Sequence, residues 1–524
     1  MAGPSTVASV LDLLMMAALC ALIMTGLPVV FVLTGCAVAF GGLGILFGVF
    51  DPFLFGALAQ RLFGTMTSEV LIAIPLFVFM GMMLERSRIA PELLEAMGRL
   101  FGPVRGGLAV SVTLVGALLA ASTGIVGATV VTMGLIALPA MMRHRYDPAF
   151  ACGTICAAGT LGQIIPPSTV MVILGEVLAA AYQQAQLAQG KFSVEIISVG
   201  QLFAGSMVPG LMLAGIYILY QLALCGLRPE VGPPIPRGER AEGEGGGLLR
   251  ALVPPVVLIV AVLGSILGGV ATPTEAASVG AVGATLLAGL RLGPGRPWPI
   301  YAAAFCALGM VALGSLFDMR LGRREAPFAD RAATAAATVL ALGLAWGVAV
   351  ALWRALRAGV LGAVSHATMT VTAMIFATLI GATLFSLVFR GLGGDEMIRA
   401  FLETIPGGKY GALLVVMLVV FVLGFPLDFV EIVIIVVPIV GPVLLAMGVD
   451  PIWFGVLIAM NLQTSFLTPP LGPTLFYLQG VLPPGVTAAQ VYRGVTPFVL
   501  LQLLGLLLVV LFPGLATWLP DRLF

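Results

Sequence analysis

The chain has 524 residues, of which 60% are hydrophobic and 9% charged, and its net charge is +1 at pH 7. Soluble domains carry about 25% charged residues, so this composition excludes an ordinary soluble protein, and the balanced charge gives no indication of a nucleic-acid partner. Apolar runs long enough to cross a lipid bilayer recur from end to end without β-barrel alternation. They predict an all-α polytopic membrane protein with about 12 transmembrane helices.

The N-terminal region, residues 1–85, is predicted to form scaffold helices. Its elements follow the apolar runs: spans at 7–25 and 28–49, an amphipathic connection over 51–68, and a span that ends at Glu85.

Residues 86–199 form a unit that we predict to be the first transport-domain repeat. An apolar stretch in it is split by Ser122-Thr123-Gly124 into halves of about 16 residues, which are short for a crossing of about 20. We therefore predict a re-entrant helical hairpin with its tip at 122–124. The next helix, 149–178, is predicted to break at Pro166-Pro167, because proline removes a backbone donor and clashes with the preceding turn.

Residues 200–389 are predicted to return to scaffold helices. The expected spans lie at 200–226, 251–270, 272–290, 299–318, 332–353 and 359–389. Glu275 follows Thr272-Pro273-Thr274 and indicates a helix start, where the first-turn dipole stabilises a carboxylate. The Ala- and Gly-rich segment 299–353 is treated as an added helix pair.

The second half of the chain, residues 390–480, is predicted to repeat the first transport unit. We expect a hairpin tip at 425–428 and a broken helix over 451–479, interrupted at Pro469-Pro470. The Asp-Pro pairs at 147 and 450 and the Pro-Pro pairs at 166 and 469 share one separation, 303 residues. A C-terminal helix within 481–524, with a span at 496–519, completes the chain.

The orientation of the two repeats follows from the number of crossings between them. An odd number, seven in this assignment, predicts an inverted repeat, as in many secondary transporters. The base of the first hairpin is the more basic: it carries Arg86, Arg88, Arg99, Arg105, Arg143 and Arg145, against Arg390, Arg399 and Lys409. Because basic residues favour the cytoplasm, we expect the first hairpin to enter from there and the second from outside.

Two matching breaks in two halves of a membrane protein point to a transporter's binding site. Helix ends and unwound carbonyls suit small cations such as sodium, and hydroxyl and amide oxygens can help to replace a cation's water. The candidates are Ser122, Thr123, Gly124, Thr160, Gly162 and Gln163 in the first unit and Asp428, Asn461, Gln463, Thr464, Ser465 and Thr468 in the second. The alternative is that single Ser and Thr residues only hold helices together.

Asp428 is singled out because a carboxylate at the bilayer centre costs about 2.5–3.5 kcal/mol on insertion scales. We expect it to face a cavity, an ion or a partner, unless the tip lies at the outer interface with Asp428 in water. Glu431 or Glu176 could be a second acid.

Several motifs together resemble the large membrane subunit of the tripartite ATP-independent periplasmic (TRAP) transporters. They are Ile165-Pro166-Pro167-Ser168, Thr272-Pro273-Thr274-Glu275-Ala276-Ala277, Gly424 to Asp428, Gly448-Val449-Asp450-Pro451, Asn461-Leu462-Gln463 and Leu467-Thr468-Pro469-Pro470. The resemblance covers about 1–290 and 359–519. The added pair 299–353 is absent from most such subunits, and the first tip has fewer serines than many.

The resemblance implies a sodium-driven, elevator-type importer of organic acids, bound as carboxylates, in the bacterial inner membrane. It also implies a small four-helix membrane subunit and a periplasmic substrate-binding protein as partners, with Na⁺ as the coupling ion and no other cofactor. Two sodium sites follow: Ser122, Thr123 and Gly124 with Gly159, Thr160 and Gly162, and Leu427 and Asp428 with Asn461, Gln463 and Thr464. We assign substrate binding to Gln163, Pro166, Ser168, Ser465 and Thr468.

Two other hypotheses remain. The same fold could couple transport to protons through Asp428. An intramembrane enzyme is disfavoured, because the sequence has only two His and contains no HExxH motif, no Walker A motif and no Ser/His/Asp set.

Overall fold

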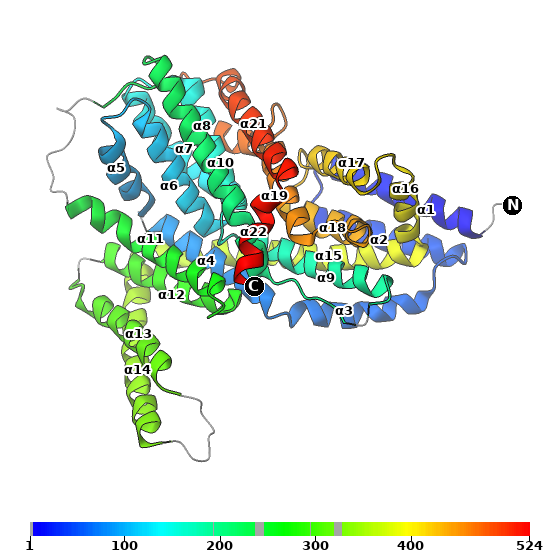
Figure 1. Ribbon diagram of the computed structural model, residues 1–524, viewed down its shortest axis with the longest axis horizontal. Helices are drawn as coiled ribbons and strands as arrows, with labels where there is room; N and C mark the ends of the chain where they lie inside the picture. Colours follow the sequence, from blue (N-terminus) through cyan, green and yellow to red (C-terminus); the bar gives the residue numbers. More distant parts are fainter. Residues whose placement is uncertain (1–3, 88, 192, 236–245, 294, 319–326) are drawn as a thin grey trace.

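The computed structural model describes residues 4–87, 89–191, 193–235, 246–293, 295–318 and 327–524. The regular elements in the described residues are all helices, with no strand among them. Figure 1 shows a broad body of packed helices with the long α15 (Val360–Leu392) running through it. The N-terminal elements are α1 (Pro4–Ile23), α2 (Val29–Leu46), η1 (Pro52–Phe55), α3 (Gly56–Met66), η2 (Val70–Ile72), α4 (Ala73–Arg86) and α5 (Ile89–Phe101).

Ten helices in the described residues are long and apolar enough to span a membrane, or up to 12 if two bent pairs each count as one span. This agrees with the prediction of an all-α polytopic protein. The ten include α7 (Val126–Arg143), α9 (Thr169–Ala188) and α18 (Phe429–Ala446), which the sequence assigned to hairpins and broken helices. Length and composition do not separate a crossing from a re-entrant arm, so the re-entrant assignment stays a prediction.

Each predicted hairpin is a helix, a short turn and a second helix. In the first, α6 (Gly107–Thr123) is separated from α7 by Gly124 and Ile125. In the second, α17 (Gly408–Leu423) is separated from α18 by residues 424–428. The second turn includes the predicted tip at 425–428, whereas the first agrees with the predicted tip at 122–124 only at Gly124, because Ser122 and Thr123 still belong to α6.

The two broken helices are interrupted at their Pro-Pro pairs. The first comprises α8 (Pro148–Thr160), η3 (Leu161–Gln163) and α9, with residues 164–168 outside any helix. The second comprises α19 (Pro451–Leu467) and α20 (Pro473–Gln479), with residues 468–472 between them. Both Pro-Pro peptide bonds are cis. The first broken helix extends ten residues beyond the predicted end at 178, because α9 continues to Ala188.

The two units pack on each other reciprocally. The second arm of hairpin 1, α7, packs on α20 of the other unit, and the equivalent arm of hairpin 2, α18, packs along α9. This exchange of equivalent surfaces is what a two-fold relation between the units produces.

One contact lies at the centre of this relation. The Gln463 side-chain amide donates to Thr160 Oγ1 at 3.3 Å, and the two residues are 303 positions apart, the separation of the repeats. Equivalent residues can touch only near the axis that relates them. Gln502 in α21 (Ala488–Leu511) also donates to Thr160 Oγ1, at 3.3 Å.

The remaining helices surround these units. They are α10 (Val199–Leu227), α11 (Gly246–Leu267), α12 (Pro273–Arg291), α13 (Trp298–Leu316), α14 (Phe328–Arg357) and α16 (Gly394–Thr404). As predicted, Glu275 lies in the first turn of α12 and accepts a hydrogen bond from the Thr272 backbone N–H at 2.8 Å.

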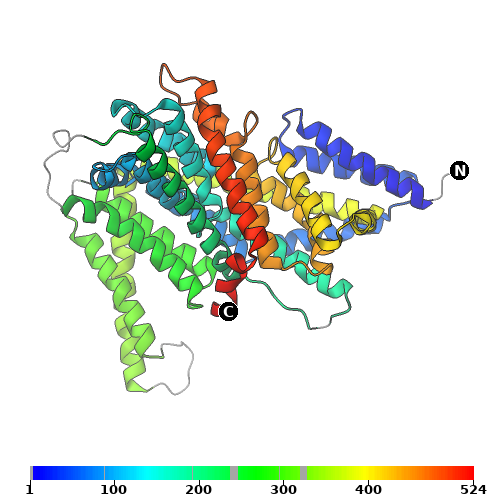
Figure 2. The same cartoon turned by 45° about the horizontal axis from the view of Figure 1, so that its top comes forward.

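The added pair, α13 and α14, forms a hairpin that projects from the body (Figures 1 and 2). Only 11% of the α14 span is buried. Its root is held by Arg354, whose guanidinium donates to the carbonyls of Gly289 and Arg296 at 3.1 and 2.8 Å, near the C-terminus of α12. The projecting part is therefore attached at one end only.

The C-terminal region differs from the prediction. A single helix with a span at 496–519 was expected, but α21 begins at Ala488 and ends at Leu511, and a separate helix, α22 (Gly514–Leu523), follows. Pro513 explains the break, since it has no backbone N–H and biases the residue before it away from helical geometry. That residue, Phe512, has φ −124° and ψ 75°.

Candidate functional site

A cavity of about 480 Å³ brings the two hairpin tips together; we call it the hairpin-tip cavity. Gly124 from the first tip and Asp428 from the second both line it, as does Gln163 from the first helix break. On the other side it is closed by predicted scaffold helices, through residues that include Met82 of α4 and Met374 of α15. The cavity thus lies between both repeats and the scaffold.

Three helices begin at this cavity. Its lining includes Val126 to Ala128 at the start of α7, Thr169 and Val170 at the start of α9, and Phe429 and Val430 at the start of α18. The first backbone N–H groups of a helix have no partner within it, and the helix dipole places partial positive charge there. Neither Ile125 nor Ser168, the residues before α7 and α9, caps its helix with a side-chain hydrogen bond. The uncapped starts of α7 and α9 therefore favour an anion, whereas the start of α18 already carries the acids Asp428 and Glu431.

Gly124 brings the first tip against the start of α9. Its φ is +63°, a conformation that other residues adopt at a cost. A Cβ atom added to Gly124 would lie 2.8 Å from the backbone nitrogen of Thr169 and would overlap the Thr169 hydroxyl. Glycine is therefore required at this point both for conformation and for space.

Asp428 is an exposed side chain on this cavity and the N-cap residue of α18. Its backbone N–H donates to the Glu431 carboxylate at 3.1 Å. The two acids thus lie one helical turn apart at a helix start, where the dipole favours negative charge. Asp428 faces a cavity, as expected from the free-energy cost of placing a carboxylate in the lipid bilayer. Glu176, the other candidate acid, lies elsewhere on α9 and accepts from Ser68 at 3.0 Å.

The first predicted sodium group is gathered around the first break. The described members Gly159, Thr160 and Gly162 lie at the end of α8 and in η3, which packs against α6. Gly124 lies at the turn that follows α6. Ser122 and Thr123 end α6, but their side chains lie outside the described residues.

The second predicted group is less compact. Gln463 and Thr464 are buried in α19, and Asn461 donates to the Met417 carbonyl of α17 at 2.6 Å. Leu427 is buried at the second tip, and Asp428 lines the hairpin-tip cavity, which none of the three α19 residues lines. The structure thus associates Asp428 with the first break.

Of the residues assigned to substrate, Gln163 lines the hairpin-tip cavity, and the other four do not. Pro166 and Ser168 lie in the first break, between η3 and α9. Ser465 packs against Gly424, where an added Cβ would overlap the serine hydroxyl, and Thr468 is the residue after α19.

Sequence reasoning missed other residues of the cavity. Thr169, Tyr477 and Arg86 line it, and Thr132 donates to the Glu85 carboxylate at 2.6 Å. Thr169 could have been found as the first residue of the helix that resumes after the Pro-Pro break. Tyr477 and Arg86 have no local signal, because they reach the cavity through tertiary packing.

Comparisons with known proteins agree with this architecture. Residues 16–296 and 295–515 match the family model described as tripartite ATP-independent periplasmic transporter, DctM component. The chain is 30% identical to the C4-dicarboxylate TRAP transporter large permease protein DctM of Pseudomonas aeruginosa, over 92% of this chain and 93% of that protein. It is 24% identical to the ectoine TRAP transporter large permease protein TeaC of Halomonas elongata, over 98% and 99% of the two chains.

A solved structure shares the fold. The YdaH transporter of Alcanivorax borkumensis aligns with a TM-score of 0.54 at 14% identity, over 99% of each chain. At this identity the likeness concerns the fold alone.

Proposed function

The chain belongs to the tripartite ATP-independent periplasmic transporter family as a DctM component, and from that premise we propose that it imports an organic acid, as its carboxylate, together with sodium. It is a multi-pass protein of the bacterial inner membrane, and its relatives are transporter permeases, not enzymes. Large subunits of this family act with a small membrane subunit and a periplasmic binding protein. Here we propose a four-helix small subunit and a binding protein that delivers the substrate.

The observation that carries the proposal is that α7 and α9 both begin at the hairpin-tip cavity without a side-chain cap. Unpaired N–H groups and aligned dipoles hold carboxylates without any dedicated cation. The relatives fit this chemistry, because one is named for C4-dicarboxylates and the other for ectoine.

Two buried amide oxygens support the sodium part of the proposal. Gln163 Oε1 and Gln463 Oε1 are buried and have no hydrogen-bond donor among the described residues. An unsatisfied buried acceptor costs about 1–3 kcal/mol, and a bound cation removes that cost. Gln163 Oε1 also belongs to the residue that lines the cavity, next to the proposed carboxylate. Sodium there would offset the charge of the substrate.

We further propose an elevator motion. The hairpins and broken helices, 86–199 and 390–480, would move as a block against the scaffold of 1–85 and 200–389. The reciprocal packing of α7 with α20 and of α18 with α9 supports a block of this kind, because it joins the two repeats to each other.

The test is uptake by the complex reconstituted with its small subunit and binding protein. The solute that the binding protein holds should accumulate under an inward sodium gradient and not under an equal choline gradient. Gln163→Leu should raise the sodium concentration for half-maximal uptake about tenfold. Gln189→Leu, at an exposed position that donates to the Ala446 carbonyl, should not. Equal uptake without sodium would reject sodium coupling.

Proton coupling remains the second candidate, because Asp428 lies on the hairpin-tip cavity. Asn also caps helices well, so Asp428→Asn removes the charge and keeps the cap. Proton coupling would be favoured if uptake by the parent protein depended on pH and not on sodium, and if Asp428→Asn abolished that pH dependence.

A further inference from the structure

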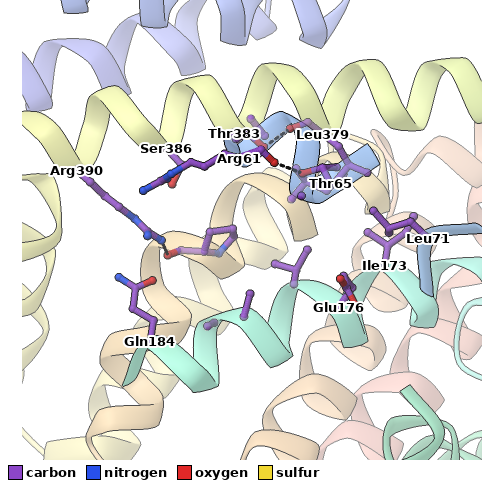
Figure 3. A pocket seen from close by; sticks show the side chains of 17 residues that line it. Arg61, Thr65, Leu71, Ile173, Glu176, Gln184, Leu379, Thr383, Ser386 and Arg390 are labelled. Carbon is purple, nitrogen blue, oxygen red and sulfur yellow. Dashed lines mark hydrogen bonds between the residues drawn. The ribbon is translucent and has the colours of Figure 1, made fainter. Parts of the chain in front are cut away.

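A second cavity, of about 450 Å³, lies along the same helices as the hairpin-tip cavity. It is formed by α3, η2, α9, α15 and α18 (Figure 3). The hairpin-tip cavity contacts α15 at 371–375 and this one contacts it at 379–390. On α9 and α18, too, the second cavity lies further along the chain. The two cavities therefore follow one another along these helices, between the repeats and the scaffold.

Arg390 is fixed at this second cavity by an unusual bond. Its Nη2 donates to the Pro438 carbonyl in α18 at 3.0 Å. That carbonyl has no helical donor, because the residue four positions on is Pro442, which lacks an N–H. Arg390 Nε is buried without a hydrogen-bond partner among the described residues, and the Asp395 carboxylate is 3.5 Å from it. Since a guanidinium has five N–H donors, much of its capacity is unused by these contacts.

Arg61 supplies a second positive charge. It extends from α3 to line the same cavity, its side chain is exposed, and it lies within electrostatic reach of Arg390. Ser386 and Gln184, which also line the cavity, add hydroxyl and amide groups at this end (Figure 3). The Asp395 carboxylate interacts with both guanidinium groups and offsets one of the two positive charges, so one positive charge remains at this end of the cavity.

The opposite end of the cavity is acidic. Glu176 lines it two turns before Gln184 on α9, roughly 12 Å away along the helix, and is held by Ser68. An anionic group is therefore favoured only at the Arg61 and Arg390 end.

We propose that this second cavity binds a small carboxylate through Arg61 and Arg390, as a station on the substrate's path to or from the hairpin-tip cavity. The identity of the carboxylate as the transported solute rests on the proposed function. The existence of the anion site does not, because it follows from the two guanidinium groups and the cavity they line.

The experiment uses the full-length protein in phosphatidylcholine nanodiscs, with Ser386→Cys as the reporter. Its modification by an anionic and by a cationic methanethiosulfonate reagent is followed by peptide mass spectrometry, so that the native cysteines do not contribute. After correction for reactivity with a free thiol, the anionic reagent should react about tenfold faster. Thr25→Cys, in the exposed turn after α1, should show no preference.

Variants of the two arginines test whether their charges cause the preference for the anionic reagent. Arg61→Gln should reduce it to about threefold or less, and Arg61→Lys should retain it. Arg390→Lys serves in place of Arg390→Gln, since it keeps a donor for the Pro438 carbonyl and should also retain the preference. An unchanged preference in Arg61→Gln, or none in the parent protein, would overturn the proposal.

Two further arms identify the occupant. Succinate should slow modification at residue 386 relative to chloride at equal ionic strength. Protection by phosphatidylglycerol in the nanodisc, with none by succinate, would make the site one for a lipid headgroup and reject the carboxylate. Protection by succinate together with sodium-independent uptake would keep this site and reject the sodium coupling proposed above.

Discussion

The two repeats share a framework and differ at the ends that meet the cavity. Both broken helices start with an Asp-Pro cap: Asp147 accepts from the Phe150 N–H at 2.9 Å and Asp450 from the Trp453 N–H at 2.8 Å. Beyond the breaks, α9 has 20 residues and begins at the hairpin-tip cavity, whereas α20 has 7 and contributes only Tyr477 to it.

The hairpin tips differ in the same way. The first turns over Gly124 and Ile125, both uncharged, and the second takes residues 424–428 and carries Asp428. Local sequence signals thus produce the same helical framework in both repeats. The chemistry of the cavity comes from the positions at which the two repeats differ. Each variant below tests one side of this comparison.

The largest effect is expected at the first tip. Gly124→Ala adds a Cβ that overlaps Thr169 and forces alanine into a left-handed conformation, at a combined cost of about 2–4 kcal/mol. We expect sodium-driven uptake to be lost. Gly26→Ala is the matched control, since Gly26 also has a positive φ but no described atom lies within 4 Å of an added Cβ. Normal uptake by Gly124→Ala would show that the tip does not need its close approach to α9.

The contact between the repeats gives the next effect. Thr160→Val removes the acceptor of both Gln463 and Gln502, so two buried amides lose a bond, at about 1–3 kcal/mol each. The thermal unfolding temperature in detergent should fall clearly. Thr464→Val loses only a bond to the Met460 carbonyl of its own helix and should change it little. Equal decreases in unfolding temperature for the two variants would mean that the contact between Thr160 and Gln463 does not stabilise the packing of the two repeats.

Charge at the second tip is tested by Asp428→Asn. If Asp428 helps to hold sodium, the sodium concentration for half-maximal uptake should rise about tenfold, which corresponds to about 1.4 kcal/mol. The N-cap is preserved, so protein yield and unfolding temperature should stay near those of the parent. Glu431→Gln, one turn away, is the control and should have a smaller effect. An unchanged sodium response would exclude Asp428 from the ion site.

The smallest effects are expected where the repeats agree. Asp147→Ala and Asp450→Ala each remove one N-cap bond and should each cost about 1 kcal/mol of stability. The two variants should lower the unfolding temperature by similar amounts. A several-fold difference would show that the shared caps support the two repeats unequally.

Much of the fold could be predicted because its signals are local. The Pro-Pro pairs at 166 and 469 mark both helix breaks, and Thr272 with Glu275 marks the start of α12. The break between α21 and α22 also had a local signal, in Pro513, but a long apolar run concealed it.

The site was harder to predict because its members are brought together by packing. Gly124, Gln163 and Asp428 were proposed from the sequence, yet their meeting in one cavity depends on how α7, α9 and α18 converge. The pairing of Thr160 with Gln463 follows from the two-fold relation, which a separation of 303 residues suggests but does not locate in space. The sequence did not predict that Arg61 and Arg390 would meet, since they lie 329 positions apart, Arg61 in the predicted scaffold and Arg390 at the predicted base of the second hairpin.

The most direct measurement is a structure of the assembled complex with sodium and the solute carried by its binding protein. The account predicts the solute's carboxylate at the starts of α7 and α9, with an ion at the amide oxygen of Gln163. A carboxylate bound elsewhere, with the hairpin-tip cavity holding only water, would contradict it.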